Sequence, residues 1–188
     1  MKTLALALAS LLALPIAASA QAPVGPGSIK LGNKVAVEVV KTPEFNLSSG
    51  PVKRTGRVGQ WIEIEVEYET KPEEIDELTF AFTAQVEKKL LTGEVTYVNI
   101  AKDKNHYAVM YISPKGIEKL TGGKPLTGAS IENVWVEVNR QGQSLDKASF
   151  KTGTVPNAAK LTGLLLNKNQ TPFAPLFYDR YEEIKPTR

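Results

Sequence analysis

The most constraining feature of the sequence is a strict alternation of apolar and acidic residues at positions 61–69, WIEIEVEYE. Successive side chains of a β-strand point to opposite faces of its sheet, so a period of two predicts a strand with one face on a core. The apolar residues would form the buried face: Ile62, Ile64, Val66 and Tyr68. A second apolar layer must then pack against this strand.

Other segments repeat the pattern and, with residues 61–69, predict about seven strands: 35–40, 78–86, 94–101, 106–112, 131–138 and 145–150. Short polar connections at 102–105 and 140–143 fit hairpins, which favours antiparallel pairing. The clearest helical signal, at 114–120, is too short for the crossover that a parallel sheet needs. We predict an all-β antiparallel sandwich with a short helical or irregular C-terminal tail.

The N-terminal residues predict export. A basic start at Lys2, an apolar run at 4–16 and the small residues Ala18-Ser19-Ala20 are typical of a cleavable signal peptide over residues 1–20. The run is too short for a stable membrane span, so we expect a mature chain in the periplasm, at the outer membrane surface or outside the cell. The rest is predicted to comprise a flexible or edge segment (21–34), the β-sandwich (35–152), and a C-terminal part (153–188) with a last strand at 161–166 and an aromatic tail that packs on the domain or a partner.

Composition leaves little catalytic chemistry. The sequence has no cysteine and one histidine, His106, which excludes a cysteine nucleophile and a multi-histidine metal site. No Gly-x-Ser-x-Gly turn is present to expose a serine, and His106 is interpreted as an ordinary histidine at a turn. A net charge of only +3 gives no reason to expect a nucleic-acid partner. We therefore predict no enzyme activity, no metal and no cofactor.

The glutamates between positions 63 and 69 are candidates for a metal or catalytic site. Alternate residues of a strand lie about 6.6 Å apart, whereas the oxygens around a calcium ion converge at about 2.4 Å. We expect the glutamate side chains to be solvated and to form ion pairs with lysines on neighbouring strands. A metal site at a sheet edge and a catalytic pair of acids are the alternatives.

The tryptophans break the expected pattern. By strict alternation, Trp61 lies on the glutamate face of its strand, and Trp135 lies opposite the valines of its own strand. Exposing two such rings is unfavourable, so they need a cover: the chain's own tail, a partner protein or second copy, or a sugar stacked on the rings. The hypothesis is one interaction surface made of both tryptophans and the tail aromatics: Trp61, Trp135, Phe173, Phe177, Tyr178 and Tyr181.

Five stretches carry a resemblance to a known family: WIEIEVEYET (61–70), KPEEIDELT (71–79), LTGEVTYVNI (91–100), HYAVMYISP (106–114) and IENVWVEV (131–138). They resemble exported, pilus-associated immunoglobulin-like proteins of Verrucomicrobia, whose genes lie near type IV pilus genes. The resemblance implies an immunoglobulin-like β-sandwich that acts without catalysis at the cell envelope, in pilus assembly, adhesion or host interaction. Because its motifs are strands and turns, no functional residue carries over.

A type IV pilin keeps a long apolar helix after its leader is cut, but APVGPG (22–27) follows the predicted cut here. Its prolines prevent a helix, so a pilus partner is expected rather than a pilin, and strand donation at a sheet edge is one way to join a fibre. Expected partners are pilus or envelope proteins, a second copy of the chain, and a host glycan or receptor. The alternative function is an exported glycan-binding (mucin-binding) module.

Overall fold

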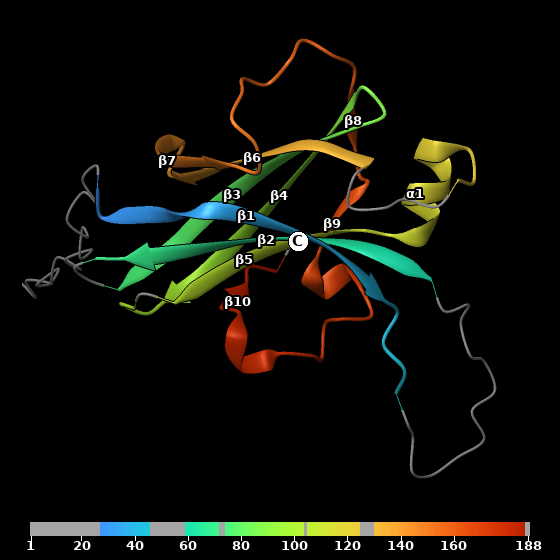
Figure 1. Ribbon diagram of the computed structural model, residues 1–188. Helices are drawn as coiled ribbons and strands as arrows, with labels where there is room; N and C mark the ends of the chain where they lie inside the picture. Colours follow the sequence, from blue (N-terminus) through green and yellow to red (C-terminus); the bar gives the residue numbers. More distant parts are fainter. Residues whose placement is uncertain (1–26, 46–58, 72–73, 104, 125–129, 187–188) are drawn as a thin grey trace, which may run out of the picture.

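The structure is a computed structural model that describes residues 27–45, 59–71, 74–103, 105–124 and 130–186. The predicted signal peptide at 1–20 and residues 21–26 of the predicted N-terminal segment lie outside the described residues. The described residues form ten strands in two sheets and one α-helix (Figure 1).

The smaller sheet has four antiparallel strands, in the order β1 (Ile29–Lys41), β2 (Gln60–Thr70), β5 (His106–Ile112) and β9 (Leu165–Asn167). The larger sheet has the order β10 (Glu183–Ile184), β4 (Lys89–Ile100), β3 (Ile75–Val86), β6 (Ile131–Arg140) and β7 (Gln143–Ser149). Strand β8 (Lys160–Thr162) pairs in parallel with β4, whereas the other pairs are antiparallel.

The two sheets pack face to face over an apolar core. The four apolar residues that the alternation of β2 placed inside are at most 1% exposed: Ile62, Ile64, Val66 and Tyr68. From the larger sheet, the ring of Phe80 lies 4.8 Å from that of Tyr68 and 5.8 Å from that of Tyr97. The Tyr97 hydroxyl accepts a hydrogen bond from the Val109 amide at 3.1 Å, which joins the layers through a polar contact as well. The fold is the predicted immunoglobulin-like all-β sandwich.

Several strand boundaries differ from those predicted: β3 begins at Ile75 rather than at position 78, and β4 begins at Lys89 rather than at position 94. Strand β1 begins at Ile29 rather than at position 35, because its pairing with β2 shifts register between Leu31 and Val35 and the bulge interrupts the alternation. The predicted last strand, 161–166, is two strands. Gly163 adopts a φ of +74° between them, and the chain passes there from the larger sheet to the smaller one.

The short helix is confirmed as α1 (Pro114–Thr121). The Ser113 hydroxyl accepts a hydrogen bond from the Gly116 amide, and Gly122 closes the helix in the left-handed conformation. The C-terminal tail, here residues 168–186, is irregular, with short 3₁₀ turns η2 (Lys168–Gln170) and η3 (Tyr178–Arg180). Within the described ranges, no helix is both long and apolar enough to cross a membrane.

Candidate functional site

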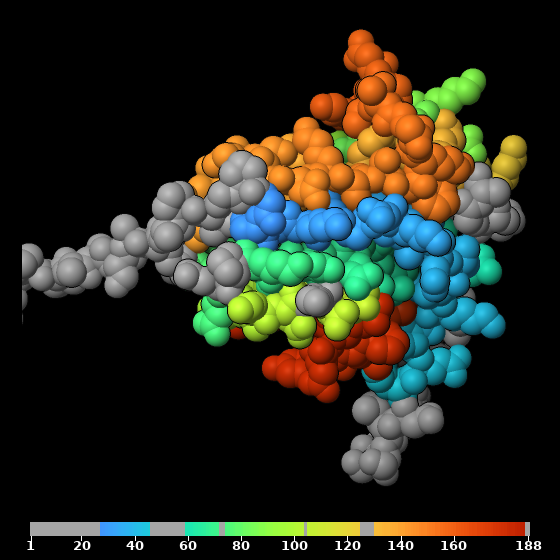
Figure 2. Space-filling view, turned by 60° about the vertical axis from the view of Figure 1, so that its left-hand side comes forward, coloured from blue at the N-terminus to red at the C-terminus, as the bar shows by residue number. Residues whose placement is uncertain are grey.

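The C-terminal tail covers the outer face of the smaller sheet. Figure 2 shows this segment, in red, packed against the strands of that sheet. Four buried residues form an apolar cluster separate from the sandwich core: Trp61, Val109, Tyr111 and Phe173. The Phe173 ring stacks on Tyr111 with centroids 4.7 Å apart and meets Trp61 edge-on at 5.5 Å. The outer face of β2 and β5 is therefore a second core between the sheet and the tail.

A charged anchor fixes the tail to β2. Arg180 donates to both carboxylate oxygens of Glu65, from Nε at 3.1 Å and from Nη2 at 2.6 Å. The Tyr181 hydroxyl donates to Glu65 Oε2 at 2.5 Å, and the guanidinium lies 3.7 Å from the ring centroid of Tyr107 on β5. Burial, followed by the bond to Glu65, raises the pKa of Tyr181, while the bond to Glu65 raises the pKa of Arg180. A two-pronged guanidinium contact fixes both the position and the orientation of the tail.

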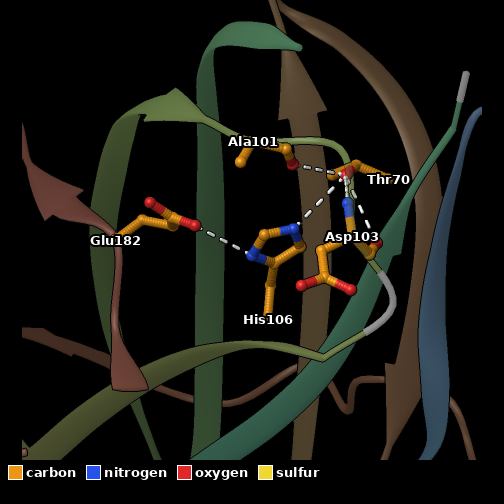
Figure 3. Close-up of polar contacts among 5 residues, drawn as sticks. All are labelled: Thr70, Ala101, Asp103, His106 and Glu182. Carbon is orange, nitrogen blue, oxygen red and sulfur yellow. Dashed lines mark hydrogen bonds and ion pairs between the residues drawn. The ribbon is translucent and has the colours of Figure 1, made fainter. Parts of the chain in front are cut away.

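A second anchor involves the single histidine (Figure 3). His106 is 6% exposed, and its Nδ1 lies 2.9 Å from Glu182 Oε1 of the tail. Its Nε2 lies 3.3 Å from the Thr70 hydroxyl, which donates to the Ala101 carbonyl at 2.8 Å and accepts from the Asp103 amide at 3.1 Å. Both ring nitrogens thus have partners, so the histidine connects the tail to the β4–β5 turn.

A pocket of about 700 Å³ lies between the tail and the β4–β5 turn. The turn side contributes Asn99, Asp103, Asn105 and His106, and the tail side contributes residues from Lys168 to Ile184. Lys168 is 5% exposed, and its ammonium donates to the Ala174 carbonyl at 2.8 Å. Burial lowers the pKa of Lys168. The pocket therefore combines an exposed polar rim with a buried cation.

A smaller hollow of about 240 Å³ lies on the other side of the tail, lined by Glu38, Glu63, Glu65 and Phe177 among others. Burial raises the pKa of Glu63, and the neighbouring carboxylates of Glu65 and Glu38 act in the same direction. Among the described residues, no group of three potential ligands could hold a metal ion.

The glutamates of β2 were expected to pair with lysines on neighbouring strands, and this is wrong for the two that form ion pairs, Glu65 and Glu69. Glu65 binds Arg180 of the tail, and Glu69 binds Lys71, which follows the same strand, at 3.1 Å. The tail packs on this face, and the alternation within one strand cannot indicate that a segment far away in the sequence will cover it.

The six residues of the predicted interaction surface do not lie together. Five belong to the tail and the face that it covers: Trp61, Phe173, Phe177, Tyr178 and Tyr181. Trp135 lies on β6 of the other sheet, where its indole donates to the Gly153 carbonyl at 2.7 Å. Of the three covers considered for Trp61, the chain's own tail is the one found.

The tail aromatics and Trp61 differ in how much of each residue is exposed to solvent. Trp61 and Phe173 are 7% and 4% exposed, whereas Phe177 and Tyr178 are 61% and 84% exposed. The sequence did not predict the roles of Glu65, Arg180 and Glu182 as polar anchors, because no motif links partners that lie 115 positions apart, as Glu65 and Arg180 do. The sequence indicated an ordinary histidine at a turn for His106, whereas the structure buries this side chain and pairs it with Glu182 of the tail.

Comparison with known proteins now defines the relationship. A family model matches residues 20–188. The chain belongs to this family. A crystal structure of a protein from Akkermansia muciniphila matches with a TM-score of 0.72 and 26% identity, over 85% of this chain and 94% of that one. No curated protein matches the sequence. The expected relationship to verrucomicrobial proteins is thus confirmed at the level of family and fold.

Proposed function

We propose that this protein is a non-enzymatic, exported component of the cell envelope that works with type IV pili, in assembly or adhesion, through contacts with other proteins. Three features support the proposal: the resemblance of its strands to pilus-associated proteins, its membership of the family, and its similarity to the A. muciniphila structure. The only histidine is occupied as a structural anchor, which fits a role without catalysis.

The observation that carries the proposal is the tip of the tail, Phe177 and Tyr178. Exposed aromatic rings are favoured anchors in protein interfaces. Phe177 has a φ of +53°, in the left-handed region that bulky residues avoid, at a cost of about 1–2 kcal/mol. The adjoining Arg180 and Glu182 anchors can hold this strained conformation. The fold thus fixes two apolar rings in solvent at an energetic cost, which is expected where a partner binds.

The test is affinity purification of the tagged full chain from its native envelope, comparing wild type with the double variant Phe177→Ser, Tyr178→Ser. Val155 is 47% exposed in another loop, so Val155→Ser is the matched control. We expect pilus components to be recovered with wild type and the control, and depleted about tenfold or more with the double variant, as for loss of a binding hot spot. Recovery of pilus components at equal levels from all three would refute the role of the tip, and their absence from wild type would refute the pilus association.

The exported location is part of the proposal and can be checked separately. Cleavage before Gln21 predicts a mature N-terminal sequence that begins QAPVG. N-terminal sequencing of the protein from envelope and culture fractions would detect it, and an intact Met1 start on the envelope-associated protein would contradict export by this route.

A further inference from the structure

We propose that the pocket between the tail and the β4–β5 turn binds a neutral saccharide. This pocket is separate from the tryptophans, where a sugar platform was considered from the sequence, since Trp61 is buried under the tail. Its volume of about 700 Å³ lies within the range of about 300–1,000 Å³ that is usual for small-ligand sites. The proposal is independent of pilus association.

The polar groups of the pocket match a polyol. Three exposed asparagines line it from different segments: Asn99 at the end of β4, Asn105 in the turn, and Asn169 in η2. A carboxamide presents two donors and an acceptor side by side, so it can bind adjacent hydroxyl groups, each of which is both donor and acceptor. Asp103 and Glu182 add carboxylate acceptors. Convergence of such groups from separate segments fixes the orientation of a ligand.

Tyr178 supplies the apolar part of the site. It lines the pocket and is 84% exposed, the highest fraction among the large exposed hydrophobic residues of the described chain. Its ring is a flat apolar surface beside hydrogen-bonding groups, and one face of a pyranose presents C–H groups that can pack on such a ring. The η3 turn and the Arg180 anchor hold this position in place without covering the ring.

Lys168 supplies a buried donor. Its ammonium has three hydrogens, of which one is used by the Ala174 carbonyl, and it lies 5.4 Å from the ring centroid of Tyr181. Its described contacts include no carboxylate, so the ammonium keeps donors for a hydroxyl or ring oxygen at the pocket wall. A buried cation without an acidic partner is costly, which gives a reason for a ligand to complete its hydrogen bonds.

The charge of the pocket favours a neutral ligand over an anionic one. Carboxylates outnumber basic side chains in its lining: Asp103, Asp179, Glu182 and Glu183 against Lys168 and Arg180. Arg180 is engaged by Glu65, and His106 by Glu182. An acidic sugar would therefore meet an excess of negative charge, whereas the hydroxyls of a neutral sugar can donate to the same carboxylates.

The test uses the purified full chain, displayed in many copies on fluorescent beads so that weak binding is detected, on an array of neutral and acidic oligosaccharides. The strongest neutral hit is then titrated against wild type, Tyr178→Ala, Asn169→Ala and the control Phe177→Ala. Asn169 and Tyr178 are exposed, so neither change should disturb folding, and Phe177 lies over the other hollow. We expect the first two variants to lose about tenfold or more in affinity, and Phe177→Ala to bind as wild type does.

Three results would overturn the proposal. In the first, the protein-coated beads bind no neutral glycan on the array, or bind only acidic ones. In the second, both pocket variants bind like wild type. In the third, Phe177→Ala weakens binding as much as the two pocket variants do. Each result would show that sugar binds outside this pocket or does not bind at all. Because the assay contains no pilus component, its failure leaves the pilus proposal untouched.

Discussion

Replacing Phe173 with alanine should detach the tail from the sheet. A buried phenylalanine truncated to alanine costs about 3–5 kcal/mol, and the two ring contacts with Trp61 and Tyr111 each account for about 0.5–1.5 kcal/mol of that sum. Phe173 belongs to the outer cluster rather than to the sandwich core. The loss therefore falls on docking of the tail, and we expect the tail to open before the sandwich unfolds.

Trp61 reports this opening directly. In a Trp135→Phe background it is the only tryptophan, since the sequence contains two. In Phe173→Ala we expect a red shift of Trp61 emission at low urea, in a transition separate from the main unfolding step. The control is Phe177→Ala, which removes an exposed ring from the same tail and should leave the emission unchanged. Unshifted Trp61 emission in Phe173→Ala, or a single transition that merely moves to lower urea, would refute the reasoning.

Three further perturbations follow from the same contacts. Arg180→Lys keeps the charge but loses the two-pronged bond to Glu65, so hydrogen exchange of tail amides should show opening easier by about 1–2 kcal/mol, and unchanged exchange would contradict the anchor. Burial raises the pKa of Glu63 above its usual 4.5, so the folded state binds this proton more tightly than the unfolded state does and loses stability as the pH rises through the raised pKa. Glu63→Gln should therefore raise the melting temperature at pH 7 more than at pH 4. An equal or reversed effect would contradict the raised pKa. Glu87 and Lys88 form a two-residue hairpin with φ values of +49° and +60°, so replacing them with Asn-Gly should stabilise the fold by about 1 kcal/mol in urea titrations, and a loss of stability would exclude this turn type.

The strands and the inner face of the sandwich were predictable because their signal is local. Alternation at 61–69 identified β2 and its buried residues, since burial on one face of a strand imposes a period of two. Where a bulge interrupts that period, as between Leu31 and Val35, the prediction began the strand too late. Gly163 likewise hid the passage between sheets, because a turn within an apolar run resembles a continuous strand.

The site was less predictable because it depends on distant contacts. Alternation correctly placed Trp61 on the outer face, and the aromatic tail was one of the covers considered, but no local pattern indicated that Arg180 would bind Glu65 or that Glu182 would meet His106. The tail docks through these side-chain contacts and through β10, which pairs with β4, and a strand of two residues leaves no period in the sequence. Trp135 has the same sequence pattern as Trp61 and lies on the other sheet, which only the strand order reveals.

Photo-crosslinking in the native envelope tests the central claim most directly. A photoreactive phenylalanine analogue at position 177 would trap whatever the tail tip contacts, and the same analogue at the exposed position 155 provides the comparison. The account predicts a crosslink from position 177, but not from 155, to a protein of the pilus system. Crosslinks from 177 that match those from 155, or that reach only proteins outside the envelope, would contradict it.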